Sequence, residues 1–302
     1  MWLVRALIRS QGQIFFQRAT LSGLVVLLAL TVASPWLAGA AVLGAAVQTG
    51  VSLLLRRPSS VSAQSDAADG IHGFCGALTG CAALLACGPS TAALTWTVLG
   101  SALCALFVRV LERIRIFTWL PMLTGPFCAV NSALNPVFGR WHQDVSAVPR
   151  FEPFGPLPDL VSGTLRACAQ VLLTDHLLTG LVVLALMFLA GAREGLWSLT
   201  GAVAATALGF WILGGESAAA GLAGYCGFLT ALALGALFPP ADAARAVRLL
   251  VPLAGACLTV PLWGALQHTG MAVYTWPFVL TTWAVLIAQH RWARREVARA
   301  AS

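Results

Sequence analysis

Residues 73–79 read GFCGALT, and residues 224–230 read GYCGFLT, so that five of the seven positions are identical. A second pair at the same separation of 151 positions joins LTGPF at 123–127 to YTWPF at 274–278. Two matches in the same order and at one separation indicate an internal duplication. We therefore expect a chain of two related halves.

Matches nearer the N-terminus extend the duplication. RSQGQI at 9–14 corresponds to RACAQV at 166–171, and SGLVVL at 22–27 corresponds to TGLVVL at 179–184, both 157 positions apart. Five prolines between residues 135 and 159 separate the halves and are typical of an extramembrane connector. The predicted organisation is a first repeat (1–135), a proline-rich connector (136–160), a second repeat (161–290) and a basic cytoplasmic tail (291–302).

The composition places the chain in a membrane. Of its 302 residues 59% are hydrophobic and only 10% are charged, whereas soluble domains have about 25% charged residues. Because a spanning helix needs about 20 apolar residues, roughly ten spans fit, five in each half. We place them near 14–34, 36–55, 71–88, 91–111 and 116–135, then near 166–190, 195–213, 217–238, 246–265 and 270–290.

The basic residues define an orientation. All 18 are arginines, and they fall between apolar segments, which indicates a topological role and not nucleic-acid binding. Five spans per half make the second repeat inverted relative to the first. An inside N-terminus leaves only Arg140, Arg150 and Arg166 outside. We expect a multi-pass plasma-membrane protein, in a bacterium an inner-membrane protein, with both termini cytoplasmic.

Apolar segments at matching places in the two halves are interrupted. Glycines crowd 70–80 and 221–227, and Pro121, Pro126 and Pro277 fall near the repeated threonines. Freed backbone groups at membrane depth are tolerated only where they face protein or a water-filled path. Paired interruptions therefore predict a site near the bilayer midplane, between the repeats.

Uncharged side chains recur at these interruptions. An aromatic residue four positions before a leucine shares a helix face with it, so the two repeats could supply two flat apolar walls. Amide and hydroxyl oxygens at intervals along such a slot suit a small, flat, neutral solute, whereas an ion would require charge rings or a carbonyl cage. The repeated residues are Gln13 and Gln170, Phe74 with Leu78, Tyr225 with Leu229, and Thr124 and Thr275.

On these motifs the chain resembles the urea transporter family over nearly its whole length. Both GFCG/GYCG segments with their following leucine and both Thr-x-Pro-Phe segments are similar to family motifs. The resemblance implies passive, channel-like urea transport, a homotrimer with one pore per protomer, and spanning helices supplemented by short re-entrant helices. It also implies a narrow selectivity filter of aromatic or leucine clamps and an oxygen ladder.

The resemblance assigns roles to individual residues. It implies that Phe74, Leu78, Tyr225 and Leu229 form the slot, that Gln13 and Gln170 stand at its ends, and that Thr124 and Thr275 contribute hydroxyls near its middle. Phe16 would be a clamp, with Leu173 as its counterpart. Cys75 and Cys226 stand where the family motif has asparagine, a symmetric change that we interpret as an alternative packing solution.

Other functions stay open at this point. A channel for a short amide, water or ammonia would use a similar path, although an ammonia channel predicts paired pore histidines, and His72 and His268 occupy no matching positions. A membrane enzyme would need a nucleophile with a base or a metal cluster, and neither is recognisable. Asp175, near the start of a second-repeat span, is a candidate for helix capping or proton coupling. We expect neither cofactor nor metal.

Overall fold

The computed structural model describes residues 2–55, 68–138, 155–240 and 244–300, with side chains described up to residue 295. All regular secondary structure in these segments is helical. The predicted all-α fold is therefore confirmed.

The first repeat begins with two short helices separated by a turn and ends with a helix that starts after a long irregular segment. Its elements are α1 (Trp2–Gln13), α2 (Thr20–Ala33), α3 (Pro35–Leu55), α5 (Phe74–Cys87), α6 (Thr91–Leu111), the 3₁₀ helix η1 (Arg115–Thr118) and α7 (Gly125–Phe138).

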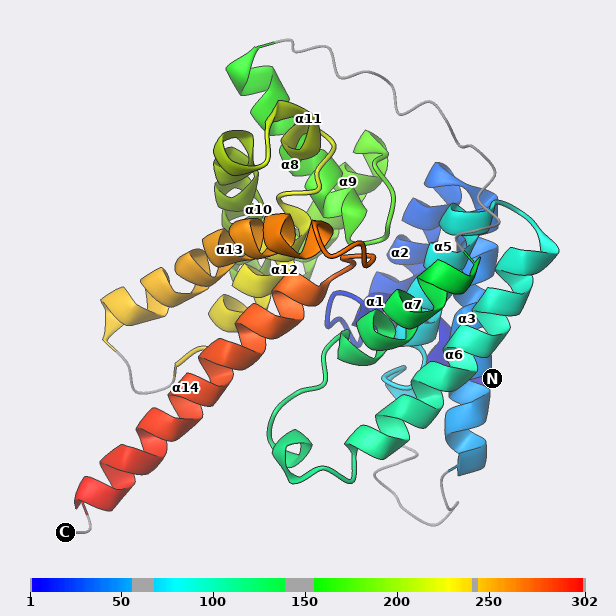
Figure 1. Cartoon of the computed structure of the whole chain (residues 1–302), viewed down its shortest axis with the longest axis horizontal. Helices are drawn as coiled ribbons and strands as arrows, with labels where there is room; N and C mark the ends of the chain where they lie inside the picture. The colour runs from blue at the N-terminus through cyan, green and yellow to red at the C-terminus, as the bar shows by residue number, and fades with distance from the viewer. Residues whose placement is uncertain (1, 56–67, 139–154, 241–243, 301–302) are drawn as a thin grey trace.

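The second repeat follows the same order, with α8 corresponding to α1 and α14 to α7. Its elements are α8 (Pro156–Gln170), α9 (Leu177–Ala190), α10 (Ala192–Ile212), α11 (Gly215–Ala219), α12 (Tyr225–Leu232), the π-helix η3 (Ala233–Leu237), α13 (Arg245–Gln267) and α14 (Trp276–Ala300). The repeats occupy opposite sides of the molecule (Figure 1) and contact each other through α2 with α9 and α7 with α14.

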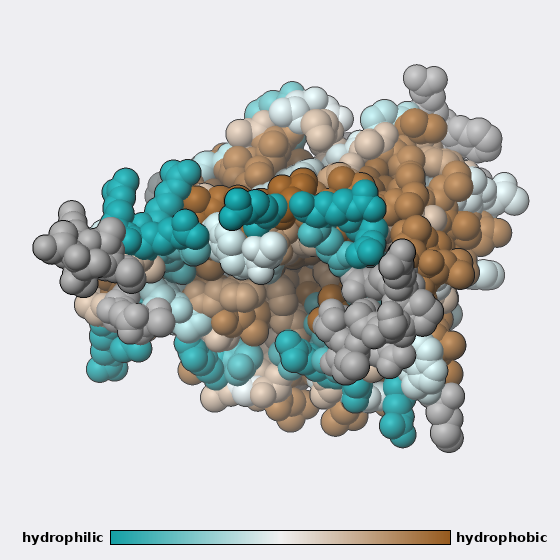
Figure 2. Space-filling model, turned by 90° about the horizontal axis from the view of Figure 1, so that it is seen from below, coloured by the Kyte–Doolittle hydropathy of each residue, from teal (hydrophilic) through white to brown (hydrophobic). Residues whose placement is uncertain are grey.

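The outer surface is that of a membrane protein. Within the described residues, the helices α3, α6, α10 and α13 are long and apolar enough to cross a membrane, and they form two repeat-related pairs. Leu54 is 85% exposed and Trp211 is 90% exposed. Figure 2 shows apolar side chains over broad parts of one face. Such exposure is favourable where lipid, and not water, surrounds the helices.

Several predicted spans differ from the observed helices. The predicted spans 116–135 and 217–238 are interrupted, because α7 begins only at Gly125 and α12 only at Tyr225. The predicted span 14–34 starts too early, since α2 begins at Thr20, and the predicted span 166–190 is divided by the turn between α8 and α9. Similar turns follow α1 and α8. In these turns Phe16 has φ of 60° and Leu173 has φ of 59°. A left-handed residue ends a right-handed helix, and side chains other than glycine adopt this conformation rarely.

Glycines bring helices of each repeat into close contact. A Cβ atom added to Gly44 in α3 would lie 1.9 Å from the carbonyl oxygen of Gly76 in α5. The related Gly201 in α10 would place a Cβ 2.5 Å from the carbonyl oxygen of Gly227 in α12. Glycine at these contacts lets the backbones approach, as in many membrane helix pairs. These contacts hold the first turns of α5 and α12, where the repeated motifs lie.

The predicted connector and tail are described only in part. The helix α7 continues to Phe138, and α8 starts at Pro156, so both reach into the predicted connector 136–160; residues 139–154 lie outside the described residues. Residues 291–300 continue α14. The repeat boundaries themselves stay a prediction.

Candidate functional site

The repeated threonines meet where the two repeats contact each other. The hydroxyl oxygens of Thr124 and Thr275 lie 2.7 Å apart in a hydrogen bond that spans 151 positions of sequence. Both side chains are buried, at 5% and 3% exposure. The predicted pairing of these interruptions is therefore present as a direct contact.

Two helix N-termini face this contact. Thr124 directly precedes α7, and Thr275 directly precedes α14, with Pro126 and Pro277 in the first turn of each helix. Proline fits there because the first N–H groups have no partner within the helix. The N-terminus of a helix carries a partial positive charge, so two such ends favour a carbonyl oxygen and disfavour a cation.

The predicted wall residues pack in one apolar cluster around this contact. Leu78, Tyr225 and Leu229 are buried members of the cluster, and Phe16, Phe74 and Leu173 pack against it from partly buried positions. The Tyr225 hydroxyl donates to the backbone carbonyl of Tyr274, the residue before Thr275. The rings of Phe16 and Phe278 meet edge to face, with centroids 6.4 Å apart. The predicted aromatic and leucine residues therefore belong to, or pack against, the same apolar core, to which both repeats contribute.

The two predicted glutamines make related contacts with a turn. Gln13 donates through Nε2 to the carbonyl oxygen of Asp69 at 2.8 Å, and Gln170 donates to the carbonyl oxygen of Ala220 at 3.2 Å. Each acceptor lies four residues before the first glycine of its repeated motif. The amide nitrogens therefore hold the turns that lead into α5 and α12, which the sequence did not indicate.

Two further polar contacts of the site could not be predicted from the repeated motifs. The Cys128 sulfur lies 3.1 Å from the Thr275 hydroxyl, and the Gln48 side-chain oxygen accepts a hydrogen bond of 2.6 Å from the Gly76 amide. Both residues occur in the first repeat alone, because the related positions hold Val279 and Ala205. Cys128 and Gln48 therefore do not appear among the residues that the two repeats share.

The cysteines of the repeated motif occupy related surroundings. Cys75 lies against the backbone of Phe127, and Cys226 lies against that of Phe278. Both side chains are buried at 1% exposure. The two cysteines therefore have related backbone neighbours in the two repeats.

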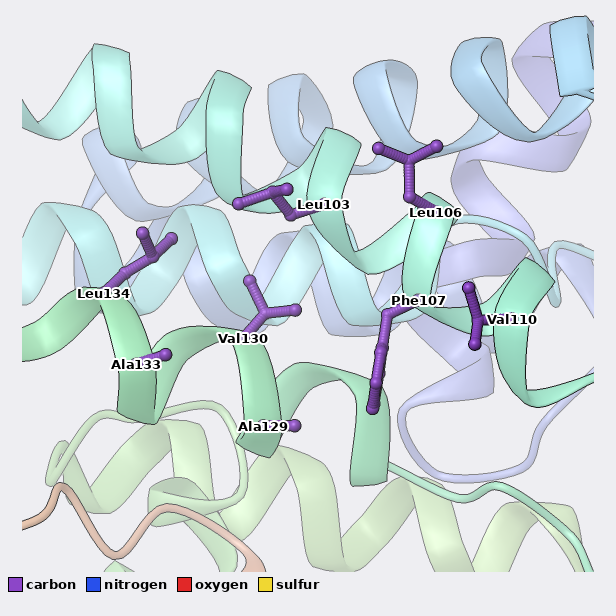
Figure 3. A pocket seen from close by; sticks show the side chains of 8 residues that line it. All are labelled: Leu103, Leu106, Phe107, Val110, Ala129, Val130, Ala133 and Leu134. Atoms are coloured by element: carbon purple, nitrogen blue, oxygen red, sulfur yellow. The ribbon is translucent and has the colours of Figure 1, made fainter.

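A separate open pocket of about 360 Å³ lies between α6 and α7. Its lining is wholly apolar, and Figure 3 shows the side chains converging from the two helices: Leu103, Leu106, Phe107, Val110, Ala129, Val130, Ala133 and Leu134. None of the predicted slot residues lines it. This pocket is distinct from the threonine contact.

The fold and this site define a polytopic membrane transport protein, in which uncharged groups from two repeats meet at the repeat interface. The chain matches the family model described as urea transporter over residues 4–290, and it belongs to the urea transporter family. The resemblance seen in the motifs is thus confirmed. Membership supports urea transport across a membrane, and the family is one of transporters and not of enzymes.

Proposed function

We propose that urea crosses the membrane passively, as in a channel, through a narrow passage between the two repeats. The observation that carries this proposal is the contact of Thr124 with Thr275 inside an apolar cluster that both repeats supply. In this proposal Phe74, Leu78, Tyr225 and Leu229 line the passage, with Phe16 as an additional clamp. Gln13 and Gln170 stand at its ends.

The chemistry of these groups suits urea. Urea is planar, with one carbonyl acceptor and four N–H donors, so flat apolar walls fit its faces and polar groups must serve its edges. A donor or acceptor left unpaired in a buried site costs about 1–3 kcal/mol. The hydroxyls of Thr124 and Thr275 can both donate and accept, and the helix N-termini beside them favour the carbonyl oxygen.

Passage requires the two hydroxyls to separate, since only 2.7 Å lies between their oxygens. Separation breaks one hydrogen bond, and urea replaces it with bonds to both threonines. The exchange keeps the number of hydrogen bonds from falling while urea passes. An apolar solute of the same size offers no such replacement, which supports selectivity for urea.

The proposed lining disfavours charged solutes. The proposed lining contains amides, hydroxyls, aromatic rings and leucines, none of which neutralises an ion. Moving an unpaired charge into a buried apolar site costs far more than moving a neutral amide. We therefore propose that the passage selects a neutral solute. A short amide or ammonia is the alternative solute.

The proposal extends to assembly and orientation. The family resemblance supports a homotrimer with one passage in each protomer. The distribution of arginines supports a plasma-membrane protein, in a bacterium an inner-membrane protein, whose two termini are cytoplasmic.

The direct test is stopped-flow measurement of urea flux into proteoliposomes that contain the purified protein, with thiourea, glycerol and ammonia measured beside it. We expect urea flux well above that of empty vesicles, and slower flux of glycerol. Urea flux equal to that of empty vesicles would reject the proposal. Faster ammonia flux with no urea flux would favour the alternative solute.

A further inference from the structure

Repeat-related arginines at the two ends of the proposed passage have different surroundings. In α1, Arg9 donates through Nε to the Thr20 hydroxyl at 3.1 Å and through Nη1 to the Ala68 carbonyl at 3.1 Å. The same Nη1 lies 3.5 Å from a carboxylate oxygen of Asp69. The guanidinium of Arg9, in the first repeat, therefore has three polar partners.

The related arginine of the second repeat, Arg166 in α8, lacks the two side-chain partners that Arg9 has. The positions that correspond to Thr20 and Asp69 hold Leu177 and Ala220, which have no polar side chain. In the described part of the chain, the Arg166 side chain makes no ion pair, and its buried Nε has no hydrogen-bond partner. A buried charged donor without a partner is costly, so this one calls for an explanation.

The backbones around the two arginines correspond closely. Gly70 and Gly221 have φ of 81° and 82°, and a Cβ added to them would lie 2.4 Å from the amide of Ser10 and 2.5 Å from that of Ala167. The carbonyls of residues 69 and 220 accept from the related glutamines. The methyl group of Ala220 therefore stands where Asp69 carries its carboxylate.

The charge at the position related to Arg18 indicates which kind of ligand fits beside Arg166. Arg18 lies 3.9 Å from Asp69 in the first repeat, and the related position of the second repeat holds an exposed acid, Asp175. A negative charge at that position disfavours an anion beside Arg166. A neutral molecule with a carbonyl acceptor fits a guanidinium donor without this repulsion.

We propose that Arg166 is a capture site that binds the carbonyl oxygen of urea at the second-repeat end of the passage. Arg166 lies one helical turn before Gln170, the residue that we propose for this end, so captured urea is delivered directly to the passage. This inference rests on the proposed function and adds a binding step to it.

The test is the dependence of urea flux on urea concentration in proteoliposomes of the full-length protein. Replacing Arg166 with Gln removes the charge and should raise the half-saturating urea concentration roughly two- to tenfold, with the saturated flux nearly unchanged. Ala220→Asp keeps the arginine but supplies the partner that Arg9 has, and should raise the half-saturating concentration in the same way. Arg248→Gln, at an exposed position in α13, is the control and should leave it unchanged.

Two results would overturn the capture site. One is a half-saturating concentration that stays at the wild-type value in folded Ala220→Asp protein. The other is competitive inhibition by sodium formate in the wild type that is absent in Arg166→Gln, because it would make the ligand an anion. Loss of all urea flux in the wild type would instead reject the proposed function, so the two failures are distinguishable.

Discussion

Thr124 and Thr275 form one hydrogen bond across the interface between the repeats, although each belongs to a different half of the chain. Each threonine directly precedes a helix, α7 or α14, and each follows a residue with positive φ, Leu123 or Tyr274. The contact is therefore fixed by the backbone on both sides. It is the natural place to test the passage.

Replacing either threonine with valine should slow urea transport. Thr124→Val or Thr275→Val keeps the shape of the side chain but removes a group that we propose binds urea, so flux in proteoliposomes should fall about tenfold or more. Thr200→Val, in an exposed position of α10, is the matched control and should leave flux unchanged. Wild-type flux in both single variants would contradict the role of this contact.

The thiol of Cys128 should matter through its hydrogen bond to Thr275. Cys128→Ser retains a group that can donate or accept, and should transport urea at close to the wild-type rate. Cys128→Val removes the hydrogen-bonding group and should lower the free energy of unfolding by about 1 kcal/mol, with slower flux. Thermal unfolding in detergent and stopped-flow flux measure the two effects. Equal losses of stability and flux in both variants would show that the size of the side chain at position 128, and not its hydrogen bond, accounts for the effect.

A methyl group at the contact of α3 with α5 should destabilise the protein. In Gly44→Ala the new Cβ would lie 1.9 Å from the Gly76 carbonyl oxygen, so the helices must separate, at a cost of about 1–3 kcal/mol or more. Gly50 lies on the same helix with no atom within 4 Å of an added Cβ, and Gly50→Ala should stabilise the protein by about 0.5–1 kcal/mol. Thermal unfolding compares them, and similar midpoints would refute this account of the contact.

Removing the glutamine amides should loosen the turns before α5 and α12. Gln13→Leu and Gln170→Leu each delete one hydrogen bond, so each should reduce both urea flux and stability, the latter by about 1 kcal/mol. Gln267→Leu, exposed at the end of α13, should have neither effect. Hydrogen exchange at residues 69–73 and 220–224 reports the loosening directly, and unchanged protection there would argue against the anchoring role.

Urea flux should be nearly independent of pH between about 5.5 and 7.5. The proposed lining consists of amides, hydroxyls and apolar groups, and free phenols and thiols titrate above this range, so no group of the lining changes charge within it. Asp175→Asn should leave this flat profile unchanged. A sigmoidal profile that disappears in Asp175→Asn would instead establish proton coupling through that carboxylate.

Much of this arrangement could be predicted, because the duplication places matching site residues in both halves of the sequence. The pairs Gln13/Gln170, Thr124/Thr275 and Leu78/Leu229 were visible as repeats, and the structure relates their surroundings in the same way. The turns at Phe16 and Leu173 could not be predicted, because a left-handed bulky residue is set by its surroundings and not by its own preference. Cys128 and Gln48 lack repeat counterparts and become evident only from their contacts.

The threonine contact also bears on how such a chain arises. A bond between the same position of two related halves has the geometry of an isologous interface, in which a patch meets its own copy across a two-fold axis. An ancestral half-length protein with one such threonine could form this contact as an antiparallel homodimer, provided that it entered the membrane in both directions. Fusion of two copies would then allow each half to diverge, and the different surroundings of Arg9 and Arg166 fit such a divergence.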